Sequence, residues 1–162
     1  MARTKAPLAL TNPSFEDLVD ALNSLARYRG GEPYRAVRFV LPVQPMPAPR
    51  PKFTHDGYAY SPKPYVTWRG NVAPHIPKLE PTITGVRCAV ALGLVLPPYK
   101  TVATPWPKGD VDNFEKSVYD IVTKRGHIWK DDVQICLNIT LKRFSEDGES
   151  PHAEVYIREW SA

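Results

Sequence analysis

Proline is unevenly distributed along this chain, and its distribution limits what the middle can fold into. Of the 18 prolines in 162 residues, 14 lie between Pro42 and Pro107. Proline removes a backbone donor and clashes with the preceding helical turn, so this segment cannot be mostly helix. The run 42–51 is expected to be extended. The two helices that periodicity predicts lie outside this segment.

The length of the chain allows one domain, with at most a small appendage. Apolar residues make up 43% and charged residues 23%, which permits a buried core and excludes disorder throughout. No run of about 18 apolar residues is present, and the first residues lack the apolar stretch of a secretion signal. Cys88 and Cys136, the two cysteines, exclude a disulfide scaffold and a cysteine-rich zinc site. We therefore expect a reducing, cytoplasmic setting.

Residues 14–29 show apolar side chains at helical spacing. Ser14 is a plausible N-cap, with Asp17 three residues on, and Gly30-Gly31 ends the helix. Such an apolar stripe usually packs on its own domain, and the alternative is a partner surface. We assign residues 1–35 to an N-terminal helical extension and residues 36–162 to the main domain.

Alternating apolar side chains predict several strands, and a helix lies among them. The strand at 86–96 is apolar on both faces, so it is expected at the centre of a sheet, with Cys88 in the core. The predicted helix at 112–125 has Asp112 as N-cap with Glu115 at capping-box spacing, and Gly126 as its stop. Further strands are predicted at 37–41, 133–141 and 153–157, the last one pairing back after a turn at Asp147-Gly148. The expected class is α+β, a small mixed or antiparallel sheet with packed helices.

Charge is also unevenly distributed. Residues 36–109 carry a net charge of +7 and residues 110–162 a net charge of −4, within a total of +4. A basic block beside an acidic block indicates a polyanion held near a cation site, and the alternative is a patchy surface without function.

Acidic residues gather in the second block. Asp110 and Asp112 lie two apart in extended chain, so their side chains point the same way. Asp112, Lys116 and Asp120 lie four apart and share one helical face. Asp131-Asp132 precedes a strong strand and would join Asp110 and Asp112 if that strand lay beside the helix N-terminus. Carboxylates at this density suit Mg²⁺ or Mn²⁺, and an adjacent lysine fits where a phosphate is also held.

Each of these features also has a purely structural interpretation. Asp112 could serve only as an N-cap, Lys116 with Asp120 only as a surface pair, and Asp131-Asp132 only as a turn. An EF-hand loop is excluded, because Phe114 and Glu115 stand where an oxygen ligand and a glycine are needed. The residues alone leave these interpretations open beside metal-assisted phosphate chemistry.

The segment Lys108 to Lys116 (KGDVDNFEK), followed by Asp120, Gly126 and Asp131-Asp132-Val133-Gln134, resembles the signature of the RusA family of Holliday junction resolvases. The upstream segments 49–53 (PRPKF) and 60–65 (YSPKPY) resemble the N-terminal part of that family, so the similarity runs from about Val37 to Ile157. The resemblance implies a homodimeric, Mg²⁺-dependent endodeoxyribonuclease, with Mn²⁺ as a substitute, that resolves four-way DNA junctions by paired symmetric nicks. Such an enzyme is encoded by bacteria and their phages.

By position, the resemblance makes Asp110, Asp112 and Asp132 the essential metal-site carboxylates and Lys116 the catalytic lysine. The residues implied as supporting members are Asp131 (also as a further metal ligand), Asp120 and Asn113. Gly109 departs from the family pattern, which usually has proline there, and this departure is expected to loosen the approach to Asp110.

DNA contact is expected from residues 50–69, where basic and aromatic side chains alternate. Basic groups bind phosphates, and aromatic rings stack on unpaired bases. Each ring could equally pack under a proline-rich loop. The residues predicted to bind DNA are Arg50, Lys52, Lys63, Arg69, Tyr60 and Trp68.

Two other functions remain open. One is a nuclease that acts on other branched or flapped DNA with the same chemistry. The other is a non-catalytic, DNA-binding recombination accessory protein whose carboxylates are structural.

Overall fold

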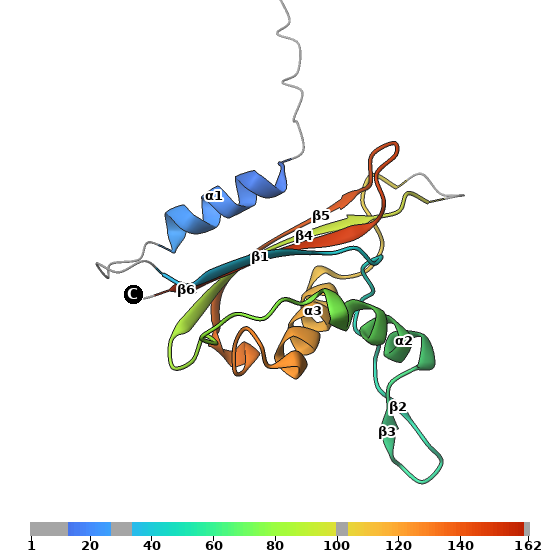
Figure 1. Ribbon diagram of the computed structural model, residues 1–162. Coiled ribbons are helices and arrows are strands. Elements are labelled where there is room, and N and C mark those ends of the chain that lie inside the picture. The colour runs from blue at the N-terminus through green and yellow to red at the C-terminus, as the bar shows by residue number, and fades with distance from the viewer. Residues whose placement is uncertain (1–12, 27–33, 100–103, 161–162) are drawn as a thin grey trace, which may run out of the picture.

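The computed structural model describes residues 13–26, 34–99 and 104–160 (Figure 1). Three helices, two short 3-10 helices and six strands make up this part of the chain. In chain order they are α1 (Phe15–Leu25), β1 (Ala36–Leu41), β2 (Lys52–Phe53), β3 (Ala59–Tyr60), α2 (Lys63–Val72), η1 (Ala73–His75), β4 (Arg87–Leu96), α3 (Val111–Arg125), η2 (Asp132–Gln134), β5 (Ile135–Phe144) and β6 (His152–Trp160).

The main sheet has four strands in the order β1-β6-β4-β5. Strand β4 pairs parallel with β5, while β6 pairs antiparallel with both β4 and β1. The sheet is therefore mixed and the class α+β, as predicted. The last strand does not pair back on β5, however, because β4 lies between them and the turn after β5 carries the chain past it. Strand β5 is left at an edge of the sheet.

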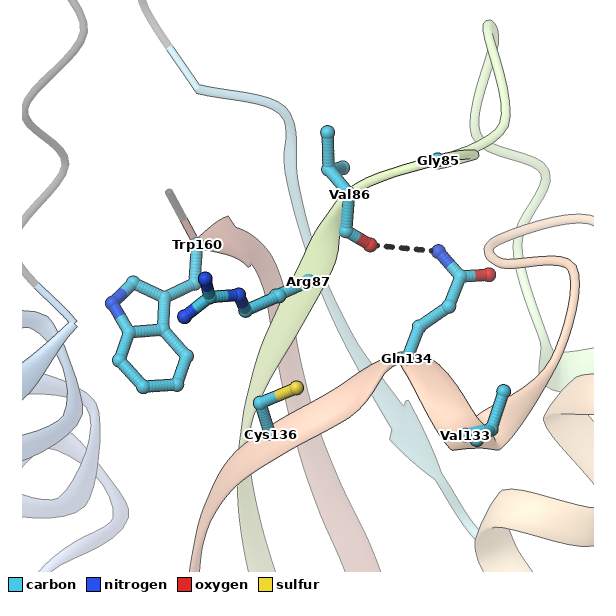
Figure 2. A pocket seen from close by; sticks show the side chains of 7 residues that line it. All are labelled: Gly85, Val86, Arg87, Val133, Gln134, Cys136 and Trp160. Atoms are coloured by element: carbon cyan, nitrogen blue, oxygen red, sulfur yellow. Dashed lines mark hydrogen bonds between the residues drawn. The ribbon is translucent and has the colours of Figure 1, made fainter. Parts of the chain in front are cut away.

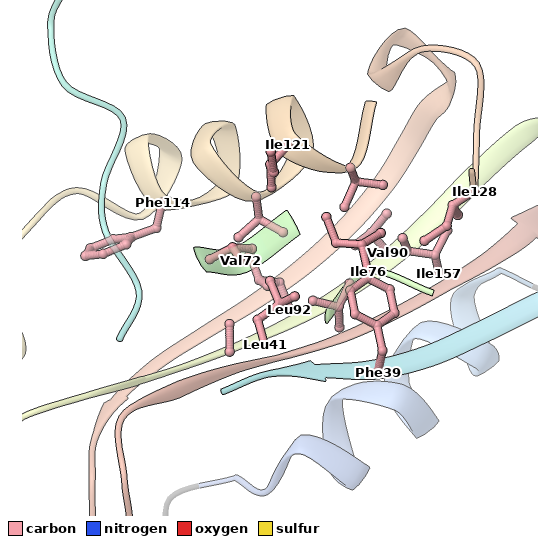
Figure 3. Packing of buried hydrophobic residues seen from close by; sticks show 14 of the residues in the cluster. Phe39, Leu41, Val72, Ile76, Val90, Leu92, Phe114, Ile121, Ile128 and Ile157 are labelled. Carbon is pink, nitrogen blue, oxygen red and sulfur yellow. The ribbon is translucent and has the colours of Figure 1, made fainter. Parts of the chain in front are cut away.

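Strand β4 is central and buried on both faces, as its sequence predicts. Val90 and Leu92 face the larger core, which α2 and α3 cover (Figure 3). Ala89 and Ala91 face α1 on the other side of the sheet. The small side chains on the second face let α1 approach closely. A Cβ atom at Gly93 would lie 2.9 Å from the ring of Phe15. The sheet is thus covered by helices on both faces.

Helix α1 packs its apolar stripe on the sheet of its own chain. Ser14 and Asp17 form the predicted capping box. The Asn23 side-chain oxygen accepts from Arg158 of β6 at 2.7 Å, and Arg38 of β1 pairs with Glu16 at 2.7 Å. The expected stop at residues 30–31 lies outside the described residues. The division into 1–35 and 36–162 stays a prediction.

Helix α2 was not predicted, because it lies inside the proline-rich middle. Its proline, Pro64, occupies the first turn, where the missing N–H costs no hydrogen bond. Tyr65, Trp68 and Val72 recur on one face and are buried against the main core. The sequence prediction failed here because a proline at a helix start was counted against the helix.

The two cysteines are free, and they differ in burial. Cys88 on β4 is fully buried, and this burial raises the pKa of its thiol to about 12, consistent with the predicted core role. Cys136 on β5 is exposed. Within the described ranges, no helix has the length and apolar character needed to cross a membrane.

The turn between β5 and β6 is held by an ion pair that makes stability depend on pH. Both terminal guanidinium nitrogens of Arg143 donate to Glu149 at 2.6 Å, and Glu149 also accepts from the Glu146 amide at 2.9 Å. These contacts lower the pKa of Glu149 to about 2, from 4.5. Because the folded-state pKa is depressed, the stabilisation is complete above pH 4.5 and is lost as the pH falls toward 2.

We therefore expect Glu149→Gln to lower the free energy of unfolding by about 1 kcal/mol at pH 7, a value reduced for partial exposure of the pair. Urea unfolding of both proteins from pH 7 to pH 2.5 measures this. The difference between them should shrink steadily below pH 4.5. A difference that stays constant over this range would mean that the ion pair does not contribute.

Candidate active site on the exposed face of α3

The loop before α3 is held by a lysine side chain of β5. Lys142 Nζ donates to the carbonyl oxygens of Pro107 at 2.8 Å and Gly109 at 2.5 Å. Gly109 has φ +90°, and a Cβ there would lie 2.7 Å from the ring of Phe114. Proline, whose φ is fixed near −65°, cannot take this conformation. Lys142 thus holds the carbonyl oxygens on both sides of Lys108, and the expected loosening of the approach to Asp110 stays a prediction.

Asp110, and not Asp112, takes the N-cap position of α3. The helix begins at Val111, and Asp110 has extended backbone angles. Its side chain accepts no capping hydrogen bond, so its carboxylate oxygens are not used by the helix. The purely structural interpretation of Asp112 as the N-cap is thus wrong. Asp112 lies in the first turn, where a negative charge also favours the helix dipole.

Helix α3 has three distinct faces. Phe114, Val118, Ile121 and other apolar residues pack on the sheet (Figure 3). Asp112, Lys116 and Asp120 are exposed, each one turn from the next, as predicted. We call these three residues the exposed row. It presents a carboxylate, an ammonium group and a carboxylate to solvent.

The third face of α3 meets a polar side of β5. Glu115 accepts from Asn138 at 2.8 Å and from Thr140 at 2.5 Å, so it does not form the predicted capping box. Lys142 follows Asn138 and Thr140 on the same side of the strand, and it holds the loop before the helix. The alternation in the sequence revealed this polar side but not what it touches. These three residues position the helix start, and sequence reasoning missed them.

Asp131 and Asp132 form the short turn that leads into β5. Asp131 caps η2, accepting from the Val133 amide at 3.0 Å. The Gln134 side chain accepts from the amides of Lys130 and Asp131 and donates to the Val86 carbonyl at 2.9 Å (Figure 2). The Asp131-Asp132 pair is therefore attached firmly to the beginning of β4. The hollow that Figure 2 shows lies beside this turn, between β4, β5 and the end of β6.

The raised pKa of Asp132 indicates that two other acids lie near it. Desolvation raises the pKa of Asp132, and the neighbouring carboxylates of Asp131 and Asp120 raise it further. Repelling carboxylates of this kind are typical of functional sites, because a bound cation can relieve them. These three acids lie toward the C-terminal half of α3.

Asp110 and Asp112 belong to the opposite end of the helix. The rise of an α-helix separates Asp112 from Asp120 by about 12 Å. Glu115 contacts the middle of β5 and Lys142 reaches back to the loop before α3, so β5 begins beside the helix C-terminal half. The acids that act on Asp132 are thus Asp131 and Asp120, and its meeting with Asp110 and Asp112 stays a prediction. Among the described residues, no group of three or more His, Cys, Asp or Glu side chains could hold a metal ion.

The donors nevertheless suit a hard divalent cation. Mg²⁺ is commonly bound by one or two carboxylates, with water and substrate phosphates as the other ligands. Asp110 and Asp112 are both exposed and two residues apart. These two carboxylates supply as many protein ligands as Mg²⁺ commonly has, without a third. The chemistry of the side chains therefore fits a metal ion shared with a phosphate and not a closed protein cage.

The predicted DNA-binding residues fall on a hairpin and on α2. Strands β2 and β3 pair Lys52 with Tyr60 and form an arm that projects from the body (Figure 1). Phe53 is 68% and Tyr58 73% exposed. The Ala48 amide donates to the Asn113 carbonyl at 2.8 Å, so the root of this arm lies against the first turn of α3. This contact places Arg50 near the end of α3 that carries Asp110 and Asp112.

Among the other predicted DNA-binding residues, Lys63 is exposed at the start of α2, and Arg69 lies over the ring of Tyr65 at 5.1 Å. Trp68 does not fit the predicted role. It is 4% exposed, stacks on Tyr65, and donates its indole N–H to the Gln44 carbonyl at 2.9 Å. Its ring packs under the proline-rich segment and is not available to a base.

The fold is thus a mixed sheet covered by helices, in which an exposed helix presents a carboxylate-lysine-carboxylate row beside a basic, aromatic arm. Such a combination of charges is suited to a protein that acts on nucleic acid, and comparison with known families identifies the class. The family model of Endodeoxyribonuclease RusA matches residues 42–158, and the chain belongs to the RusA family. It is accordingly an endodeoxyribonuclease, and family membership implies activity on Holliday junctions. A search of curated proteins gave no match.

Proposed function

We propose that this protein is a Mg²⁺-dependent resolvase that cuts four-way DNA junctions by paired symmetric nicks. The observation that carries the proposal is the exposed row on α3, which has acids at both ends and the root of a basic, aromatic arm beside its N-terminal end. Asp110, Asp112, Asp132 and Lys116 are the proposed catalytic residues, with Asp131, Asp120 and Asn113 in support. The described part of the chain shows no three-carboxylate cluster, so phosphate oxygens of DNA are expected to complete the metal's ligands.

The mechanism follows from the residue types on the row. Asp110 and Asp112 would hold Mg²⁺, or Mn²⁺ in its place. The bound ion would supply polarisation of a phosphoryl oxygen and a water of lowered pKa as the nucleophile for hydrolysis. Lys116 lies one turn beyond Asp112 on the exposed row and stabilises the negative charge that develops on the phosphoryl group. The exposed aromatic residues of the arm, Phe53, Tyr58 and Tyr60, stack on bases that are unpaired at the junction.

Paired nicks require two active sites. A four-way junction has near-twofold symmetry, and a homodimer matches it with one site for each of two strands. We propose a cytoplasmic homodimer, encoded by a bacterium or a phage, in which residues 36–162 form the catalytic domain and residues 1–35 an N-terminal helical extension.

Cleavage of three labelled substrates tests the substrate class: a four-way junction, a flap and a linear duplex of matched sequence. The proposal predicts that the junction is cut in preference to both others. Equal rates on all three would contradict junction specificity. Preference for the flap would support a nuclease of the same chemistry on other branched DNA.

Lys142 offers a more local test of the site. Because its ammonium group holds the loop that ends at Asp110, Lys142→Met is expected to lower kcat for cleavage about tenfold, an estimate for a misplaced catalytic group. The Kd for the junction should change little. Lys142→Arg, which keeps a donor to the two carbonyl groups, should recover part of the rate. A rate loss matched by an equal loss of binding, or by unfolding, would contradict this positioning role.

A further inference from the structure

A hollow between α2 and α3 has three basic residues in its lining. Its volume is ≈ 320 Å³. Arg69 lines it from α2, and Lys124 and Arg125 line it from the last turn of α3. The rest of its wall is small or apolar: Val66, Gly70, Ala73 and Ile121.

Within the described residues, neither Arg69 nor Lys124 nor Arg125 forms an ion pair. The nearest acid before them along α3 is Asp120, one turn before Lys124. Arg69 lies over the Tyr65 ring at 5.1 Å, a contact that orients its guanidinium without neutralising it. No acidic residue lines the hollow. An oriented arginine beside two further cations is suited to an anion with several acceptor oxygens, such as a phosphate.

We propose that this hollow binds a backbone phosphate of the DNA substrate, away from the cleaved bond. The proposal rests on DNA being the ligand, as in the proposed function. Lys124 continues the exposed row one turn beyond Asp120. The rise of the α-helix places Lys124 about 18 Å from Asp112. About five nucleotides of one DNA strand span the same length along the duplex. The hollow thus fixes the path of one DNA arm relative to the catalytic end of α3.

A purely structural alternative exists for two of these residues. Cations in the last turn of a helix interact favourably with its dipole, whatever the protein binds. That alternative predicts that neutralising Lys124 or Arg125 lowers thermal stability slightly and leaves DNA affinity unchanged. It also gives Arg69 no role, because Arg69 belongs to another helix.

The test measures junction affinity against salt concentration, by fluorescence anisotropy without divalent metal so that no DNA is cut. Each contact with a phosphate contributes about 0.9 to the slope of log K against log salt. We expect R69Q, K124Q and R125Q each to reduce the slope, by at most about this amount, because the three side chains share one phosphate contact. R38Q removes a charge on the face that α1 covers, and it should not change the slope. Slopes equal to wild type, or lowered equally by R38Q, would overturn the proposal.

A second measurement identifies the phosphate itself. Single methylphosphonate substitutions along each junction arm neutralise one phosphate at a time. One position, about five nucleotides from the cut, should weaken binding by the wild-type protein but not by R125Q. A position-independent response would contradict a defined site. A wild-type protein that binds the junction but does not cut it would contradict only the proposed function. A wild-type protein that binds no DNA would contradict both proposals.

Discussion

Asp112→Asn is expected to abolish junction cleavage, with a rate loss of at least about 10²–10³. The substitution keeps the size of the side chain but removes the charge that holds the metal ion beside the scissile phosphate. Asp112 is exposed and makes no capping hydrogen bond for α3, whose N-cap is Asp110. The folded structure should therefore be retained. Single-turnover cleavage of a labelled four-way junction measures the effect.

Binding of the same junction should survive Asp112→Asn, and it should strengthen if the loss of negative charge dominates. A gel-shift titration without metal checks this. Asp20→Asn is a matched control, because it removes an exposed carboxylate from α1, on the other face of the sheet. Unchanged cleavage by Asp112→Asn would contradict the assigned role and favour an accessory protein with structural carboxylates.

Lys116→Met should also cost about 10²–10³ in the cleavage rate. Lys116 stands between Asp112 and Asp120 on the exposed row, and within the described residues it forms no ion pair with either. Its charge is thus available to the substrate. The long methionine side chain keeps the helix propensity while removing the ammonium group. Single-turnover rates at saturating DNA separate this loss from a loss of affinity.

The metal dependence distinguishes Lys116 from the carboxylates. Raising Mg²⁺ should not restore cleavage by Lys116→Met, because the lysine acts on the phosphate and not on the ion. Lys116→Arg should recover part of the rate, and Lys78→Met, a distant exposed control, should behave as wild type. Full activity of Lys116→Met would show that the exposed row is only a solvated helix face.

Local patterns predicted much of the fold because they report which side of an element is buried. The apolar residues on both faces of 86–96 placed β4 at the sheet centre, and the alternation after Asp132 predicted β5. The Ser14 capping box located the start of α1. In each case the signal lies within one element, so no long-range contact was needed to interpret it.

The candidate site was predicted less completely, because its geometry depends on contacts between elements. The N-cap of α3 is Asp110 and not Asp112, in a loop where Gly109 adopts a positive φ and Lys142 holds the Gly109 carbonyl. Trp68 was predicted at the DNA surface and is buried, because α2 turns its ring inward.

The placement of Asp132 shows the same limit. Its neighbours depend on how β5 packs against α3, through Glu115 with Asn138 and Thr140. A single sequence does not contain that packing in any local pattern.

The most direct test of the account is to map nicks on all four strands of a synthetic four-way junction, with Mg²⁺ and with EDTA. We predict nicks at symmetric positions on two opposing strands with Mg²⁺, and none with EDTA. Intact strands with Mg²⁺, or the same cleavage in EDTA, would contradict it.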